Sequence, residues 1–221
     1  MRYDWNSNVN FKEGSEIFFQ EIDRRFFESF KSIFEWKKIP FDNFVNIESF
    51  KNKKVLEIGV GNGSHAQILA KYSFNYDGID ITDFAVNMTK KRLNNLKLQG
   101  NIFKMDAENL DFEDSSFDYI WSWGVIHHSS NTKNIISEIN RVLKPKGKAF
   151  IMVYNRGWWN YYIVGIFFYG ILKLGFFKGK SLNQSMQENT DGALARYYSS
   201  KTWKELTKKY FNIKYIKISG N

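Results

Sequence analysis

Glycines and an acidic residue recur with a fixed spacing early in the chain. Glu57, Gly59, Gly61 and Gly63 stand at every second position, directly after a short apolar run with β-branched residues. That run predicts a buried strand, and the spacing of apolar residues from Ser64 onward predicts a helix with this serine as its N-cap. A glycine-rich turn between a strand and a helix lets a ligand approach the main-chain N–H groups closely. The stretch therefore predicts a ligand-binding loop.

This loop differs from two common phosphate-binding loops. A dinucleotide-binding Gly-x-Gly-x-x-Gly pattern would need a glycine at the position of Ser64, and no Gly-Lys-Ser/Thr sequence follows. The alternative to a dedicated site is an ordinary turn, because glycine-rich turns open many βαβ units.

An acidic side chain ends the next predicted strand. Asp80 follows Gly63 by 17 residues, a place where a carboxylate can accept hydrogen bonds from both hydroxyls of a ribose. Ile81 comes next and offers an apolar surface for an adenine ring. The alternative for Asp80 is a capping role at the helix predicted from Asp83.

Two adjacent histidines follow the fourth predicted strand. His127 and His128 would lie at the mouth of the sheet. A histidine that titrates near neutral pH suits the deprotonation of an oxygen acid such as a phenol or a carboxylic acid. One of the pair is expected to orient or deprotonate a substrate; the alternative is that both line the site without titrating.

Apolar runs define the elements that position these residues. The predicted strands are 55–58, 76–80, 102–105, 117–120 and 149–154. Because they alternate with stretches of helical spacing, they predict an α/β fold, with a doubly wound, mostly parallel sheet and helices on both faces. Ligands bind such sheets at the carboxyl ends of the strands. An amphipathic helix is also predicted at 13–36, and a last helix and a sixth strand at 201–210 and 212–219.

The loop and the histidine run together resemble the class I S-adenosylmethionine-dependent methyltransferases that act on small molecules. The spacing from Glu57 to Gly63 is similar to the first motif of that family, and the run from Trp121 to His128 is similar to its motif after the fourth strand. The resemblance is strong over residues 50–155 and loose in the flanks. It implies a Rossmann-like sheet and S-adenosyl-L-methionine as the cofactor.

The resemblance also implies roles for individual residues. The acidic residue and glycines of the loop would surround the methionine part of the cofactor, Asp106 would accept a hydrogen bond from the adenine amino group, and the main chain of Ala107 would contact the ring. A surface turn is the alternative for Asp106. The cofactor-binding residues expected in this way are Glu57, Gly59, Gly61, Gly63, Asp80, Ile81, Asp106, Ala107 and Trp123.

The flanks are expected to cover the site within a single domain. Its predicted parts are an N-terminal helical cap (1–50), a cofactor-binding core (51–155), a cap insertion (156–198) and a last helix and strand (199–221). Tyr3 and Trp5 are lid candidates by the resemblance. The residues expected to shape the substrate pocket are Tyr154, Asn155, Tyr197 and Tyr198.

An almost wholly apolar stretch occupies residues 157–177. It begins directly after the fifth predicted strand and contains Asn160, Lys173 and several glycines, features that argue against a membrane span. A helix that is apolar on all sides must be covered on all sides. Three roles fit: a cap over the substrate pocket, a homodimer contact, or an interfacial contact with a membrane surface.

Composition bounds the remaining choices. The absence of cysteine excludes disulfides, zinc–thiolate sites and cysteine nucleophiles, and no metal site is expected. The first residues lack the apolar core of a signal peptide, so the expected location is cytoplasmic, with peripheral membrane association as the alternative. The net charge of +9 comes from scattered lysines, which favours a generally basic surface over a dedicated nucleic-acid interface.

The sequence thus predicts methyl transfer from S-adenosylmethionine to a small-molecule acceptor, at oxygen, by in-line displacement. The alternatives are a non-catalytic cofactor-binding or membrane-surface partner protein and a nucleic-acid methyltransferase. Nucleic acid is disfavoured as a partner, because the Asn/Asp-Pro-Pro-aromatic motif of adenine and cytosine N-methyltransferases is replaced here by Trp121-Ser122-Trp123-Gly124.

Overall fold

The computed structural model describes residues 11–34, 40–42, 44–156 and 195–218. The lid candidates Tyr3 and Trp5 and the apolar stretch 157–177 therefore lie outside the described residues. Within the described ranges, no helix combines the length and the apolar character needed to cross a bilayer.

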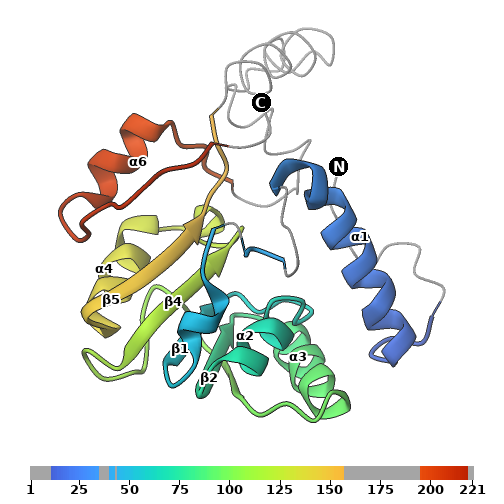
Figure 1. Ribbon diagram of the computed structural model, residues 1–221. Helices are drawn as coiled ribbons and strands as arrows, with labels where there is room; N and C mark the ends of the chain where they lie inside the picture. Colours follow the sequence, from blue (N-terminus) through green and yellow to red (C-terminus); the bar gives the residue numbers. More distant parts are fainter. Residues whose placement is uncertain (1–10, 35–39, 43, 157–194, 219–221) are drawn as a thin grey trace, which may run out of the picture.

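Five strands form the central sheet (Figure 1). The strands are β1 (Lys54–Ile58), β2 (Asn75–Asp80), β3 (Asn101–Lys104), β4 (Phe117–Trp123) and β5 (Leu143–Met152). Their order is β3-β2-β1-β4-β5, and every ladder is parallel. The predicted doubly wound α/β sheet is confirmed, and the carboxyl ends of β1, β2 and β3 meet at one edge.

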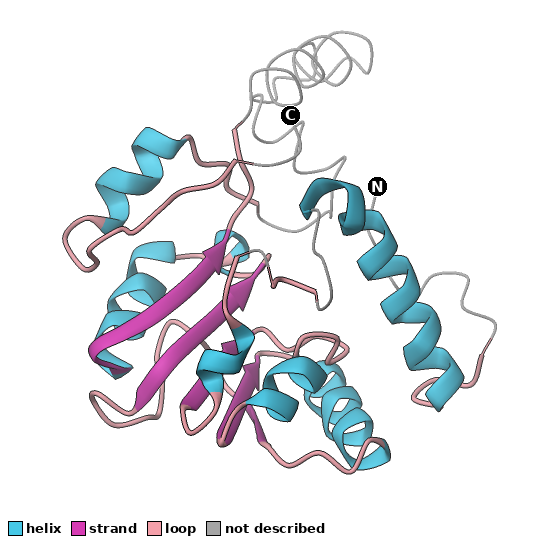
Figure 2. Ribbon diagram, in the orientation of Figure 1, coloured by secondary structure: helices cyan, strands magenta, loops and turns pink. Residues whose placement is uncertain are grey.

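Helices cover both faces of this sheet (Figure 2). The helices are α1 (Glu16–Phe34), α2 (Ala66–Tyr72), α3 (Asp83–Asn95), α4 (Thr132–Val142) and α6 (Ser200–Thr207). Successive side chains of a strand point to opposite faces, which explains the two layers. Val55 belongs to the core cluster that contains Leu69 of α2 and Val86 of α3. Leu56 belongs to the second cluster, with Ile136 of α4, and residues of α6 pack against that cluster.

The N-terminal helix α1 confirms the predicted amphipathic helix and packs on α3. Phe18, Phe19, Ile22 and Met88 form a small core cluster between the two helices. The guanidinium of Arg92 lies over the ring of Phe19, 4.4 Å from its centroid. Because α3 follows β2 directly, this packing places α1 beside the loops at the carboxyl edge of the sheet.

The C-terminal segment does not form the predicted strand. Residues 212–218 make no ladder in the described structure, so the prediction of a sixth strand at 212–219 is wrong for them. A groove of about 1330 Å³ is lined by this segment and by β5, whereas pairing needs strands about 4.8 Å apart. The segment contacts Phe44 instead: the Tyr215 hydroxyl donates to its carbonyl oxygen at 2.9 Å, and Lys217 Nζ lies 4.7 Å from the centroid of its ring.

Candidate cofactor and acceptor site

The glycine loop connects β1 to α2 in a conformation that requires glycine. Gly59, Gly61 and Gly63 have φ angles of +82°, +52° and +77°, a region that residues with a Cβ rarely adopt. A Cβ on Gly59 would lie 2.2 Å from a methyl carbon of Val125, and one on Gly63 would lie 3.1 Å from Thr89 Oγ1. A Cβ on Gly61 would meet no atom within 4 Å. The loop is thus packed at its two ends and open at its middle glycine.

Ser64 does not cap α2, so that part of the prediction is wrong. The N-cap of α2 is His65, which makes no side-chain capping bond. The Ser64 hydroxyl donates to Asp23 of α1 at 2.7 Å instead. Asp23 also accepts from Gln67 Nε2 at 2.6 Å. A carboxylate from the N-terminal helix therefore holds the end of the loop.

Asp80 lies at the end of β2, beside the open part of the loop. Its Oδ2 accepts a hydrogen bond from the Gly61 main-chain N–H at 3.2 Å, and its Oδ1 accepts from the N–H and hydroxyl of Thr82 at 3.0 and 2.9 Å. A carboxylate oxygen has two lone pairs, so Oδ2 keeps one for a ligand hydroxyl. Thr82, not Asp80, caps α3. Ile81 is 65% exposed, which leaves a bare apolar surface next to this carboxylate.

Asp106 occupies the corresponding place after β3. It is exposed, and its Oδ1 accepts from the Glu108 main-chain N–H at 2.8 Å. Its second oxygen accepts no hydrogen bond from the described residues. Ala107 is half-buried against the second core cluster. The structure therefore brings Gly61, Asp80 and Asp106 to the same edge, as their predicted shared site requires.

Glu57 lies beneath the loop, in a buried polar cluster. Its Oε2 accepts a hydrogen bond from the Tyr76 hydroxyl at 2.5 Å, and burial raises its pKa to about 8. His65 accepts a hydrogen bond from Trp121 Nε1 on its Nδ1 at 3.1 Å, and burial lowers its pKa to about 3. The two groups are 3.9 Å apart, but with these pKa values both are mainly neutral at pH 7, so they form no ion pair. Contact of Glu57 with a cofactor stays a prediction.

Trp123 is part of an aromatic stack on the α2–α3 face of the sheet. Its ring is nearly parallel to those of Trp121 and Phe150, with centroids 6.2 and 5.9 Å away. Phe41 packs on the same stack from the N-terminal side. Trp123 is 8% exposed, so most of its surface is used in packing, and its contact with a cofactor stays a prediction.

The two histidines differ in their surroundings. His127 is fully buried, with its ring 3.9 Å from that of Tyr154 and 4.1 Å from that of His128, centroid to centroid. Burial lowers the pKa of His127 to about 2, and neither of its ring nitrogens has a hydrogen-bond partner within the described ranges. An enclosed imidazole with so low a pKa is a weak base that an acceptor molecule does not reach, so His127 is the poorer candidate of the pair for a general base. His128 is half-buried and reaches the surface.

The predicted pocket residues form two groups, one beside the histidines and one that pairs away from them. Tyr154 packs against both histidines, and Tyr197 lies 5.6 Å from it, centroid to centroid. Tyr198 pairs with Asn155 in an isolated parallel bridge. Its hydroxyl donates to Thr132 Oγ1 at 2.9 Å. Tyr154 and Tyr197 therefore form one aromatic cluster with the histidines. The hydroxyl of Tyr198 instead binds the first residue of α4.

Sequence reasoning missed four charged residues that organise this edge: Asp23, Arg92, Glu108 and Arg196. Asp23 and Arg92 meet beside the loop, and Glu108 and Arg196 bind the turn after the histidines. Their partners are 21 to 69 positions away in the chain. No local pattern marks such pairs, so only the folded structure reveals them.

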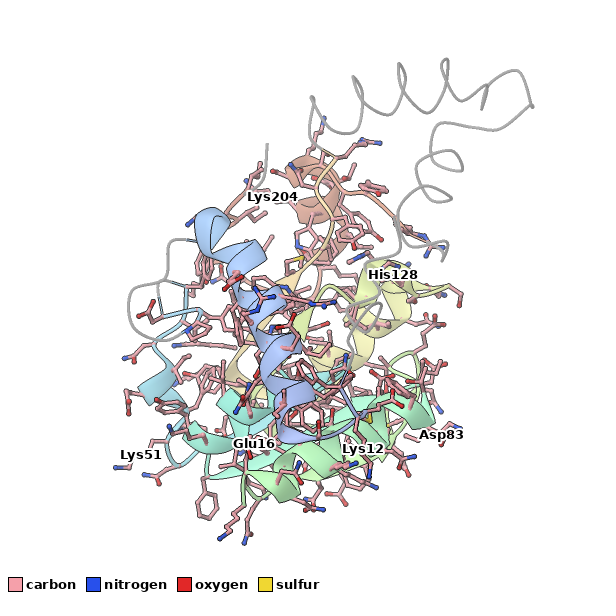
Figure 3. The ribbon with its side chains drawn as sticks, turned by 90° about the vertical axis from the view of Figure 1, so that its right-hand side faces the viewer. Lys12, Glu16, Lys51, Asp83, His128 and Lys204 are labelled. Carbon is pink, nitrogen blue, oxygen red and sulfur yellow. The ribbon has the colours of Figure 1, made fainter. Side chains whose placement is uncertain are left out.

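The residues at this edge fit an S-adenosyl group. The open side of Gly61 admits a ligand against the main chain, Asp80 and Asp106 each retain acceptor capacity, and Ile81 provides an apolar face. Figure 3 shows the labelled His128 and Asp83, the first residue of α3, on the same side of that view. The fold is that of a doubly wound α/β domain, and this edge has the groups that a nucleoside-binding site requires.

Comparison with known families identifies the domain further. Residues 56–151 match the model of the methyltransferase domain family. The match spans the loop, Asp80, Asp106 and the histidine pair. The fold and this match support a class I S-adenosylmethionine-dependent methyltransferase domain in that part of the chain.

Curated relatives match the same part of the chain. It is 35% identical over 106 residues to phosphoethanolamine N-methyltransferase 2 of Caenorhabditis elegans, covering 47% of this chain and 24% of that protein. It is 28% identical over 123 residues to the ubiquinone biosynthesis O-methyltransferase of Bartonella tribocorum, covering 55% and 50%. The chain therefore spans half or less of the length of these relatives.

Solved structures share the fold. The YcgJ protein of Bacillus subtilis superposes with a TM-score of 0.58 at 22% identity, over 75% of this chain and 65% of that one. A protein of Methanosarcina mazei described as a SAM-dependent methyltransferase also gives 0.58, at 20% identity, over 75% and 83%.

Proposed function

We propose that this chain transfers a methyl group from S-adenosylmethionine to an oxygen atom of a small-molecule acceptor. The observation that carries the proposal is the meeting of Gly61, Asp80 and Asp106 at the carboxyl edge of β1, β2 and β3. The relatives support a small-molecule acceptor, since the names of two of them specify O- and N-methylation of small molecules.

The cofactor supplies a methyl group on a positively charged sulfur, and the neutral thioether that leaves is already a good leaving group. The protein must therefore hold the reactants in line and exclude water. The open side of Gly61 would receive the methionine end, Asp80 would accept hydrogen bonds from the ribose hydroxyls, and Asp106 would accept one from the adenine amino group. Each of these contacts is made by a group that the fold already holds in place.

The acceptor side is assigned to His128. An oxygen acceptor that arrives protonated needs a base, and His128 is the histidine of the pair that reaches the surface. His127 packs against it as a neutral, buried ring. In this proposal His128 takes the acceptor proton, and His127 and Tyr154 fix the orientation of its ring.

Calorimetric titration of S-adenosylhomocysteine into the intact chain tests the cofactor site. We expect micromolar binding, weakened at least about tenfold by Asp80→Ala, because the lost hydrogen bonds involve a charged acceptor. Asp114→Ala is the matched control: Asp114 is an exposed carboxylate paired with Arg141 just before β4, at the opposite end of the strands. Binding that Asp80→Ala leaves intact would contradict the assignment.

Turnover is tested separately with a labelled methyl donor and a panel of phenols, carboxylic acids and amines. Incorporation into an oxygen acid that His128→Ala abolishes supports the proposed chemistry. Cofactor binding without any methylation across the panel would instead favour a non-catalytic binding protein.

A further inference from the structure

Glu108 binds the turn that follows the histidine pair. Its Oε1 accepts hydrogen bonds from Ser129 Oγ at 2.6 Å, Ser130 Oγ at 2.8 Å and the Asn131 main-chain N–H at 2.9 Å. These bonds lower the pKa of Glu108 below its ordinary value, that with Ser129 most strongly. One oxygen of one carboxylate thus gathers three donors from consecutive residues.

Arg196 binds the same turn through its carbonyl groups. Its Nη1 donates to the Ser129 carbonyl oxygen and its Nη2 to that of Ser130 at 2.8 Å. Its main-chain N–H donates to the His127 carbonyl oxygen at 2.9 Å. The Glu108 carboxylate therefore accepts hydrogen bonds from the donors of the turn, and the Arg196 guanidinium donates to its carbonyl oxygens. Hydrogen bonds with one charged partner are the stronger kind.

Glu108 also belongs to the loop that carries Asp106. The Glu108 main-chain N–H donates to Asp106 Oδ1, so the two side chains are fixed in one short turn. His128 immediately precedes Ser129 at the other end of the connection. The adenine loop after β3 and the histidine turn after β4 are joined by a single carboxylate.

We propose that Glu108 and Arg196 are positioning residues that couple the adenine loop to His128. They form a clasp, defined here as Glu108, Arg196 and the turn Ser129–Asn131. The clasp fixes the distance between the adenine loop and the histidine turn. When a ligand orders one of them, the clasp restricts the motion of the other as well. The proposal rests on the proposed function for the roles of the two loops in binding cofactor and acceptor. The hydrogen bonds of the clasp are independent of that function.

Glu108→Ala and Glu108→Gln together test the clasp. All three bonds use Oε1, and a glutamine retains that acceptor, so glutamine is expected to rescue the loss caused by alanine. We expect Glu108→Ala to weaken S-adenosylhomocysteine binding about tenfold and Glu108→Gln by no more than about threefold. Glu113→Ala is the matched control, since Glu113 is an exposed carboxylate in the same connection between β3 and β4 whose side chain makes no hydrogen bond among the described residues.

Proton NMR of the histidines distinguishes coupling from a purely stabilising role. A residue that only stabilises the fold would not change how the His128 signal responds to ligand. The chain has three histidines, so the imidazole C2–H signals can be assigned by single substitutions. S-adenosylhomocysteine should shift the His128 signal in the intact chain and in Glu108→Gln, and should leave it unshifted in Glu108→Ala. Ser130→Ala removes one exposed side-chain donor and should give an intermediate response, which keeps the test usable if Glu108→Ala does not fold.

The outcomes are distinct for the two proposals. If the intact chain does not bind S-adenosylhomocysteine, the proposed function fails, and the clasp is still tested by whether Glu108→Ala and Arg196→Met change the His128 signal of the free protein. The clasp is overturned if folded Glu108→Ala binds as tightly as the intact chain with an unchanged His128 response. It is also overturned if Glu108→Gln loses as much affinity as Glu108→Ala.

Discussion

Asp23 of α1 and Arg92 of α3 form an ion pair beside the glycine loop, with Oδ1 and Nη1 2.7 Å apart. The Arg92 side chain is 1% exposed, and its Nη2 also donates to the Phe19 carbonyl oxygen. The same Asp23 carboxylate accepts from Ser64 and Gln67. This pair therefore ties the N-terminal helix to both the end of the loop and the helix after β2.

Asp23→Ala is expected to destabilise the fold strongly. It leaves a buried guanidinium without its counter-charge, which costs about 3–5 kcal/mol when one partner of a buried pair is removed. Urea unfolding followed by tryptophan fluorescence measures the change. Asp23→Ala combined with Arg92→Met should recover part of the loss, because the uncompensated charge is then gone.

An exposed pair on the same helix supplies the control for this experiment. Glu28 pairs with Arg24 at the surface of α1, and exposed pairs contribute little. Glu28→Ala should leave the unfolding midpoint nearly unchanged. Equal effects of Asp23→Ala and Glu28→Ala would contradict the role given to Asp23.

Three buried groups predict a stability maximum near pH 6.5. Burial raises the pKa of Glu57 from 4.5 to about 8, so the folded state holds a proton that the unfolded state has released, and stability falls as pH rises through this range. Burial lowers the pKa values of His65 and His127 from 6.5 to about 3 and about 2. The unfolded state then binds the extra protons, and stability falls as pH falls below 6.5. Between 4.5 and 6.5 the two histidines outweigh the one carboxyl group.

Melting temperatures recorded from about pH 5 to about pH 8.5 test this balance, in which each proton contributes about 1.4 kcal/mol per pH unit. Glu57→Gln keeps the acceptor for Tyr76 but cannot ionise. Its stability should stay level from pH 6.5 to 8, where that of the intact chain declines. An unchanged decline in this variant would show that Glu57 is not its source.

Alanine at two glycines of the loop should separate packing from ligand access. Gly59→Ala forces a Cβ into Val125 and should lower the unfolding midpoint markedly. Gly61→Ala should lower the free energy of unfolding by only about 1–2 kcal/mol, the cost of placing alanine at a positive φ. Its Cβ, however, enters the open side of the loop. We expect Gly61→Ala to lose more affinity for S-adenosylhomocysteine than its stability change explains. Calorimetry and thermal unfolding on both variants decide this.

His127 should tolerate an apolar replacement of similar size. Its ring nitrogens have no partner among the described residues, so removing them deletes no hydrogen bond. His127→Leu should change the free energy of unfolding by less than about 1.5 kcal/mol, whereas His127→Ala should cost about 2 kcal/mol or more through the cavity it leaves. Chemical denaturation compares the two. A large loss in His127→Leu would mean that the imidazole makes a contact of its own.

Local patterns predicted much of this molecule. The strand that ends at Asp80 and the glycine loop before Ser64 were readable because apolar runs and glycines act over a few neighbouring residues. The prediction that Ser64 caps α2 failed because its hydroxyl binds Asp23, 41 positions earlier. The strand predicted at 212–219 failed for a related reason: its alternating pattern describes one segment, while a strand also needs an adjacent edge, and a groove separates it from β5.

The central position of β1 has a consequence for how the chain acquires its structure. Val55 pairs with Tyr76 on one side and with Tyr119 on the other, and Gly59 packs against Val125. The second neighbour of β1 is thus synthesised long after the first, and parallel pairing over such separations is slow. During translation the glycine loop cannot make its contact with Val125 until β4 and the residues after it have left the ribosome. The earliest compact intermediate should therefore contain β1 and β2 but lack the complete carboxyl edge of the sheet.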